Sequence, residues 1–287
     1  MTAVLKHELS NYFHSLTAYI FGAFLLAFVG IGAMIYNIQQ AVANFEYVLS
    51  FVSLVFVVLI PVLTMRVIAE ERKQKTDQLL YSLPITTTQI VVGKYLALLA
   101  VYLLPLCIVS VYPLIFARYG EVYLLTAYGS VIAFFIMGAA LIAIGMFISS
   151  LTENQGFAAG IAIPVILLNY YSVSLAEHVS STAFGSAAAL CVLCCLLGFV
   201  IRFLTRNEKL AYAVAIVLIL AVCVTYYMDS TVFEGLLPDI MTRLSLFERF
   251  YTIVSGVFDL TAIVYYLTVI VFFLFLSVQS LEKRRYN

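Results

Sequence analysis

The stretch EERKQKTDQLLYSLPIT, residues 70–86, is the longest clearly polar segment in an otherwise apolar chain. Its first half is charged, with opposite charges three or four positions apart, as in Glu71 and Lys75. Such pairs are neighbours on one face of a helix. No helix breaker precedes Pro84, so the pattern predicts a helix over 70–81.

A second helix is expected to follow this segment. Pro84 disfavours a helical conformation at Leu83, which predicts a turn there. Thr86 then fits a helix N-cap, and Gln89, three residues later, fits its partner in a capping box. The helix that starts here would enter the membrane near Lys94.

The turn between these helices carries a compact apolar group, and its members are Leu79, Leu80, Leu83 and Ile85. Two interpretations follow from the residues alone. The apolar side rests on lipid while basic side chains meet head groups, or the group docks into a cytoplasmic partner.

The composition is that of an integral membrane protein. Of 287 residues, 64% are hydrophobic and 10% are charged, whereas a soluble domain has roughly 25% charged residues. The formal net charge is zero, so nothing indicates a nucleic-acid partner. The expected surroundings are the lipid bilayer.

Eight apolar windows have the length of a membrane-spanning helix, about 20 residues. They are 17–38, 48–69, 93–116, 124–149, 157–176, 184–203, 210–228 and 260–280. With a cytoplasmic N-terminus, twelve of the fifteen basic residues lie in cytoplasmic segments, as the positive-inside rule requires. The sequence therefore predicts an all-α polytopic protein, multi-pass, with both termini cytoplasmic.

The polar segments complete this single transmembrane domain, 1–287. Residues 1–16 precede the first span, and 70–92 form the main cytoplasmic segment. Residues 229–259 have apolar residues at helical spacing and predict one or two interfacial or re-entrant helices outside the membrane. The last span is 260–280.

Few ionisable residues fall inside the predicted spans. Arg66 and Lys94 lie near span ends, where long basic side chains snorkel to the interface. Glu46 is expected in an external loop. Asp259 is placed as the N-cap of the last span. Gly138, Ala139, Ala140 and Gly145 give the fourth span a surface suited to close helix packing.

No catalytic motif is recognisable, and the chain contains no G-x-x-x-x-G-K-[ST] nucleotide loop. Cys191 and Cys194 have metal-ligand spacing, but they lie in the middle of an expected helix without a nearby histidine or charge. We therefore interpret them as ordinary apolar residues of that helix. We expect no enzyme activity, no metal and no cofactor on this chain. An ATPase that drives it would be another polypeptide.

Four segments resemble the membrane-spanning permease subunits of type-2 ABC exporters, particularly the gliding-motility permease branch. They are LKHELSNYFHSLTAYIF (5–21), IPVLTMRVIAEERKQKTDQLLYSLPITTTQIVVGKYLA (60–97), IGMFISSLTENQ (144–155) and FERFYTIVSGVFDLTAIVYYLTVIVFFLFLSVQSLEKRR (247–285). The first resembles the amphipathic helix that precedes the family's first span. The second resembles the central signature of the family.

The resemblance implies a bacterial inner-membrane permease with a separate ATP-binding subunit and a second permease chain, identical or related. ATP and Mg²⁺ would bind the partner subunit. The family core has six spans, so 184–228 would be an inserted two-helix hairpin. Members often have Gly and Glu where this chain has Lys75 and Gln78.

The resemblance also implies docking residues. The coupling helix, which fits a cleft on the ATP-binding subunit, corresponds here to Glu70, Glu71, Arg72, Thr76, Asp77, Leu79, Leu80, Leu83, Pro84 and Ile85. A second, smaller cytoplasmic contact corresponds to Ser150, Thr152, Glu153 and Asn154.

Two functions from other classes remain as alternatives. A secondary transporter or channel would be active in vesicles without ATP or a partner. A membrane scaffold that assembles surface machinery would support ATP hydrolysis but transport nothing.

Overall fold

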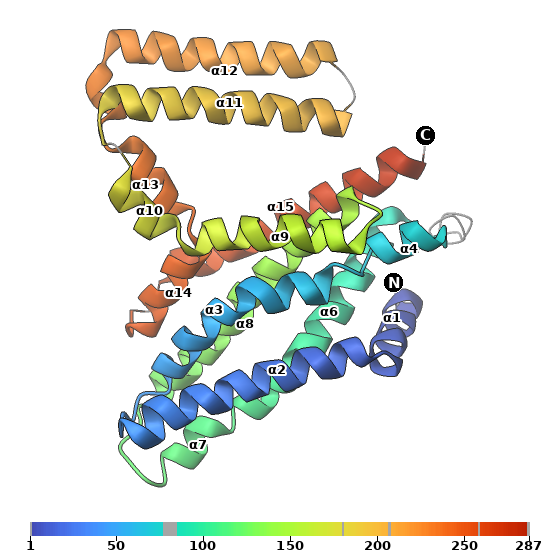
Figure 1. The fold of residues 1–287 in the computed structure, drawn as a ribbon, viewed down its shortest axis with the longest axis vertical. Coiled ribbons are helices and arrows are strands. Elements are labelled where there is room, and N and C mark those ends of the chain that lie inside the picture. The colour runs from blue at the N-terminus through green and yellow to red at the C-terminus, as the bar shows by residue number, and fades with distance from the viewer. Residues whose placement is uncertain (1, 77–84, 180, 206–207, 258, 286–287) are drawn as a thin grey trace. The chain divides into compact units, whose positions relative to one another are not determined.

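The computed structural model describes residues 2–76, 85–179, 181–205, 208–257 and 259–285, and every regular element within these ranges is helical (Figure 1). The helices fall into two compact units. Unit 1 contains Met1–Tyr170 and Arg249–Asn287, and unit 2 contains Tyr171–Glu248. The predicted all-α class is thus confirmed for the described chain.

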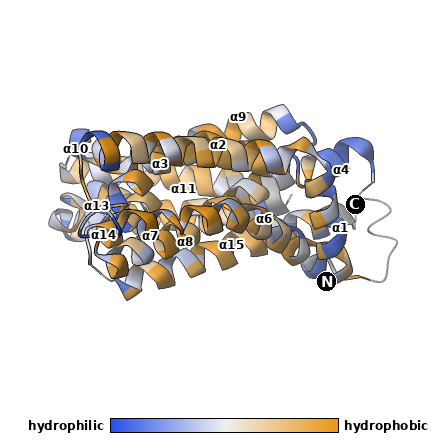
Figure 2. Cartoon of the chain, turned by 90° about the horizontal axis from the view of Figure 1, so that it is seen from below, coloured by the Kyte–Doolittle hydropathy of each residue, from blue (hydrophilic) through white to orange (hydrophobic). Residues whose placement is uncertain are grey.

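Unit 1 is a bundle built around one central helix. Its elements are α1 (Thr2–His14), α2 (Leu16–Ala33) with the π-helical extension η1 (Met34–Gln39), α3 (Glu46–Thr64), α4 (Ala69–Gln74), α6 (Thr87–Val109), α7 (Tyr112–Phe116), α8 (Leu124–Leu151), α9 (Gln155–Tyr170) and α15 (Leu260–Arg285). Helix α8 packs against α3, α6, α9 and α15, and α1 packs on α6 and α2. In Figure 2 the long helices are hydrophobic along their length, whereas hydrophilic residues gather around α1 and α4.

The small residues of α8 allow its neighbours to approach closely. A Cβ atom at Gly138 would lie 2.6 Å from the Tyr102 ring of α6. A Cβ atom at Gly145 would lie 2.9 Å from the Cβ of Thr64 on α3, and closer still to its Oγ1. Both distances are too short for a methyl group, which confirms the predicted role of these two glycines in packing.

Two predicted helix starts are present. Thr86 Oγ1 accepts a hydrogen bond from the Gln89 backbone N–H at 3.2 Å, and the Gln89 side chain accepts one from the Thr86 N–H at 3.3 Å. At the start of α15, Asp259 Oδ1 accepts the backbone N–H of Thr261 at 2.9 Å. The hydrogen bonds from Thr261 also hold the pKa of Asp259 below its usual range. Both caps confirm the sequence interpretation.

Unit 2 contains a helical pair and several short elements. They are α10 (Ser172–His178), α11 (Ala183–Thr205), α12 (Glu208–Met228), the 3₁₀ helix η2 (Ser230–Phe233) and α13 (Leu236–Arg243). Helices α11 and α12 pack against each other, as expected for a hairpin. Helix α14 (Leu246–Val254) crosses the sequence boundary between the units.

The described helices fit several membrane crossings. Five are long and apolar enough to span a bilayer: Leu16–Gln39, Glu46–Gln74, Thr87–Phe116, Leu124–Leu151 and Leu260–Lys283. The number rises to seven if each of two bent helix pairs counts as one span. Each of the eight apolar windows overlaps a helix, and the full count of eight spans stays a prediction.

The prediction for Glu46 is wrong. This residue is the first of α3 rather than part of an external loop, and only 4% of its surface is exposed. The helix begins two residues before the apolar window does, and the neighbouring Phe45 and Val48 are fully buried. Because α3 begins at Glu46, its carboxylate lies among packed residues rather than in a loop.

Candidate functional site

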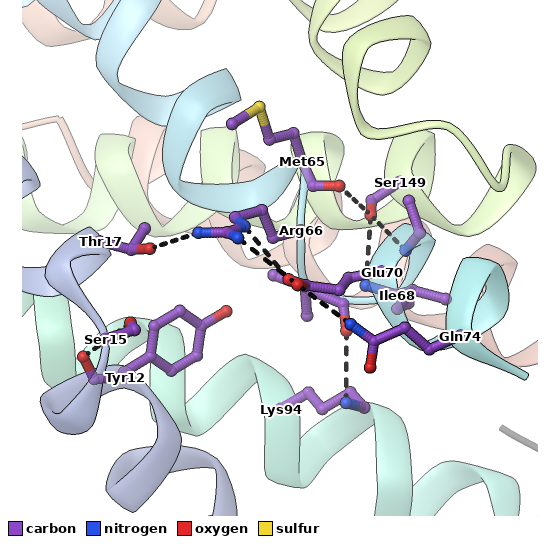
Figure 3. A network of polar contacts seen from close by, with 12 residues as sticks. Tyr12, Ser15, Thr17, Met65, Arg66, Ile68, Glu70, Gln74, Lys94 and Ser149 are labelled. Atoms are coloured by element: carbon purple, nitrogen blue, oxygen red, sulfur yellow. Dashed lines mark hydrogen bonds and ion pairs between the residues drawn. The ribbon is translucent and has the colours of Figure 1, made fainter. Parts of the chain in front are cut away.

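The start of the charged helix α4 is fixed by a serine from α8. Ser149 Oγ accepts the backbone N–H groups of Ile68 and Ala69, at 3.3 and 3.2 Å, and donates to the Met65 carbonyl at 3.1 Å (Figure 3). The first N–H groups of a helix have no partner inside the helix. Ser149 supplies that partner and ties the turn between α3 and α4 to α8.

A buried lysine connects α4 with two further helices. The ammonium of Lys94, on α6, lies 2.7 Å from Glu8 of α1 and 2.6 Å from Glu71 of α4. It also donates to the Val67 carbonyl at 3.3 Å. The Lys94 side chain is 1% exposed, so the predicted snorkelling is wrong. Two carboxylates compensate the cost of burying its charge.

A second ion pair joins the first turn of α4 to the loop that precedes it. Arg66 Nε lies 3.1 Å from a carboxylate oxygen of Glu70, Nη2 donates to Glu70 at 3.4 Å, and Nη1 donates to Thr17 Oγ1 of α2 at 3.1 Å (Figure 3). Gln74 Nε2 also donates to Glu70, at 3.4 Å. This pair is partly exposed, so it contributes less than the Lys94 cluster. It nevertheless joins the α4 region to the first span.

Helix α1 packs closely on α6. Gly93 of α6 leaves room for Val4, because a Cβ atom there would lie 3.0 Å from the Val4 Cγ1.

Tyr12 is buried beside the carboxylates of α1 and α4. Burial, and then the charges of Glu8, Glu71 and Glu70, raise the pKa of Tyr12. Its hydroxyl therefore stays protonated.

Helix α4 ends earlier than predicted. It stops at Gln74, and Lys75 has the left-handed backbone conformation with φ = 57°. The Thr76 N–H bonds the Glu71 carbonyl at 3.0 Å and the Lys75 N–H bonds that of Arg72 at 3.2 Å, which is the Schellman pattern of a helix C-terminus. Side-chain charge pairing in the sequence does not reveal this backbone reversal.

The departure at Lys75 has a simple physical meaning. A left-handed residue after a helix is usually glycine, because a Cβ atom is strained there. Members of the family that the quoted segments resemble often have Gly at this position. The chain keeps the conformation with a lysine, which projects a charge from an exposed turn.

Only part of the predicted docking segment is described. Glu70, Glu71, Arg72 and Thr76 lie on or directly after α4, and Ile85 precedes α6. Arg72 is buried, whereas the other four are partly exposed. Asp77, Leu79, Leu80, Leu83 and Pro84 lie outside the described residues.

The predicted second contact forms the turn between α8 and α9. Thr152 is partly exposed, and Glu153 and Asn154 are exposed. Asn154 Oδ1 accepts the Gly156 N–H at 2.9 Å and so caps α9. Ser150 is 0% exposed, and its carbonyl accepts a hydrogen bond from Ser280 of α15 at 3.0 Å. Its side chain is therefore part of the packing inside this chain.

Sequence reasoning missed three residues of this site. Glu8 and Lys94 are 86 positions apart, and Ser149 is about 80 positions from the turn that it binds. A lysine inside an apolar helix was the available signal, because a charge there needs a partner. Nothing in the spacing indicated which carboxylates would supply it.

The geometry so far defines a class: a polytopic helical membrane protein with a short charged helix anchored to four of its other helices. A family model described as ABC-2 family transporter protein matches residues 32–176, which is half of the chain. The chain therefore belongs to the ABC-2 transporter family and is a membrane component of a transporter. No curated protein and no solved structure matches it.

Within the part of the chain that the structure describes, no group of three His, Cys, Asp or Glu residues is arranged to hold a metal ion. The site is thus built from ion pairs and backbone hydrogen bonds. Such a cluster holds helices together.

Proposed function

We propose that this chain is the permease subunit of an ATP-driven ABC exporter in a bacterial inner membrane, of the gliding-motility permease type. Family membership supports the permease assignment. The branch is supported by the four sequence segments quoted above. Both termini would be cytoplasmic, with two permease chains, identical or related, forming the path.

A separate ATP-binding subunit would dock on residues 70–85 and bind ATP and Mg²⁺. The observation that carries this proposal is the anchoring of α4. Ser149, Lys94 and Arg66 connect its two turns and the preceding loop to α8, α6, α1 and α2. A push on α4 therefore reaches four helices through short, partly buried contacts.

The expected mechanism is a population shift. Closing of the ATP-binding subunits would move the docked segments, and the bundle would exchange between two arrangements of its spans. Helix α4 is suited to this role because its N-terminus and its acidic face are both fixed. The chain itself would not hydrolyse ATP.

One experiment tests the need for a partner. The chain is expressed with the product of the neighbouring open reading frame, and the two are purified through a tag on this chain. We expect a co-purifying protein with a G-x-x-x-x-G-K-[ST] loop that hydrolyses ATP. Vesicles that contain this chain alone should show no solute or ion flux.

The alternatives give different results in the same experiment. Flux through vesicles without ATP or a partner would identify a secondary transporter or channel. A stable complex that hydrolyses ATP, yet transports nothing from the cell in which it is made, would identify a scaffold. Either result contradicts the exporter proposal.

A further inference from the structure

Four of the five cysteines lie on the two long helices of unit 2. Cys191, Cys194 and Cys195 belong to α11, and Cys223 belongs to α12. All four are free thiols. The spacing in the sequence drew attention to Cys191 and Cys194, which share one helix. The structure instead brings Cys191 toward the neighbouring helix.

The pairing of α11 with α12 is fixed by contacts at both ends. Near the end of α11, Arg202 Nη1 donates to the Tyr212 hydroxyl at 3.1 Å, and the guanidinium carbon lies 5.8 Å from the centre of the same ring. Before the start of α11, the Ser181 carbonyl accepts the Gly235 N–H at 2.9 Å. The two helices therefore pack side by side and antiparallel in one register (Figure 1).

This register places Cys191 opposite Cys223. Cys191 precedes Arg202 by eleven residues, and Cys223 follows Tyr212 by eleven. Eleven residues are about three helical turns. Each cysteine therefore lies on the same helix face as its partner in the Arg202–Tyr212 contact, and both lie at the same height along the pair. In agreement with this register, the Cys191 and Cys223 side chains interact with each other.

The spacing of packed helices suits a disulfide at this position. Helix axes in contact lie about 8–10 Å apart, and each Cα atom lies about 2.3 Å from its axis. Cα atoms that face each other across such a pair are therefore within the roughly 7 Å that a disulfide can bridge. We expect the bond between Cys191 and Cys223 to form by rotation of the two side chains.

The depth of the pair favours oxidation from one side of the membrane. Cys223 lies five residues before Met228, the last residue of α12, which is about 8 Å along the helix. With the cytoplasmic termini proposed above, this end of α12 lies toward the outer side, and disulfides form and persist in the bacterial periplasm. Cys223 is exposed, whereas Cys191 is partly exposed, so an oxidant meets Cys223 first.

We propose that Cys191 and Cys223 form a reversible disulfide that joins α11 to α12, with another disulfide as the oxidant. The Cys223 thiolate attacks one sulfur of the oxidant, and the other sulfur leaves as a thiol. The Cys191 thiolate then attacks Cys223 Sγ in this mixed disulfide and releases the second thiol. Two protein thiols are oxidised, one oxidant disulfide is reduced, and both protons pass to the released thiols. The bond would prevent α11 and α12 from separating until a reductant breaks it.

One equivalent of dithiodipyridine tests this pair in the full chain, purified in detergent at about pH 8, near the ordinary pKa of a thiol. An internal disulfide releases two thiopyridone molecules for each reagent molecule, whereas a mixed disulfide releases one. We expect two. A maleimide added to the denatured product should then label three of the five cysteines, and dithiothreitol should restore all five labels. The product should migrate as a monomer on a non-reducing gel.

Single variants identify the two thiols. Cys191→Ala and Cys223→Ala should each stop the reaction at the mixed disulfide, with one thiopyridone released. Cys194→Ala and Cys195→Ala remove thiols from the same helix as Cys191. They are the matched controls and should still release two.

The proposal is overturned if the unaltered chain releases one thiopyridone, or if the product is a cross-linked dimer. Release of two by Cys191→Ala or Cys223→Ala, or of one by either control variant, would assign the bond to other thiols and would overturn it as well. No ATP-binding subunit takes part in this measurement, so its outcome is independent of the exporter proposal.

Discussion

Replacing Lys94 with methionine should destabilise the chain by about 3–5 kcal/mol, the usual cost of removing one partner from a buried ion pair. Methionine has a similar length, so little volume is lost. The carboxylates of Glu8 and Glu71, which lie within 2.7 Å of the ammonium, would remain without their cation. Thermal unfolding of the purified chain in detergent measures the effect.

A triple variant separates charge from packing at this cluster. Lys94→Met combined with Glu8→Gln and Glu71→Gln leaves no unpaired charge and should recover most of the lost stability. Lys6→Met, on the exposed side of α1, should leave the unfolding temperature unchanged. If Lys94→Met alone melts like the unaltered chain, the buried cluster is not what holds α1 to α4.

A methyl group at Gly145 should also have a large effect. Gly145→Ala drives a Cβ atom against Thr64, which is fully buried and bonds the Ile60 carbonyl through Oγ1 at 2.9 Å. Overpacking of this kind costs about 1–3 kcal/mol, and occasionally more. We expect a lower yield of folded protein and a lower unfolding temperature, measured in the same assay.

Helix α8 supplies its own control. Gly129→Ala lies in the same helix with no other atom within 4 Å of the new Cβ, and alanine is the better helix former by about 1 kcal/mol. This variant should therefore be neutral or stabilising. Adding Thr64→Ala to Gly145→Ala removes Oγ1, the closest atom, and should restore part of the stability. Equal behaviour of Gly145→Ala and Gly129→Ala would contradict the close α3–α8 approach.

Local patterns predicted much of the fold. Apolar windows are long in this chain and interrupted by few charges, so their positions agree with the helices. Helix starts depend on neighbouring residues, which is why the caps at Thr86 and Asp259 were predictable. Small residues in the fourth span also indicated a close packing surface, and Gly138 and Gly145 meet Tyr102 and Thr64 there.

The polar contacts of the site depend on which helices pack together. Patterns among neighbouring residues do not show this packing. The partners of Lys94 come from α1 and α4, and Ser149 reaches α4 from the far end of α8. The end of α4 depends on a left-handed residue, and lysine gives no indication of that conformation. Contacts between helices distant in sequence therefore determine the partners of Lys94 and Ser149, and charge pairing along the chain did not predict where α4 ends.

The contacts around α4 connect the proposed docking segment to the bundle. Lys94, Arg66 and Ser149 each join it to a different helix or pair of helices. The proposed function requires that a separate ATP-binding subunit grips the residues that follow α4. The apolar group Leu79, Leu80, Leu83 and Ile85 is the surface that the sequence predicts for this contact.

The most direct test of this account is co-purification of the ATP-binding subunit with Leu79→Asp or Leu80→Asp. Each places a charge in the predicted docking surface, and we expect recovery of the partner to fall at least tenfold, which corresponds to about 1.4 kcal/mol of binding free energy. Tyr119→Asp, in an exposed loop, should retain the partner, and all three variants should insert into the membrane normally. If Leu79→Asp and Leu80→Asp retain the partner at normal yield, residues 70–85 are not the docking segment.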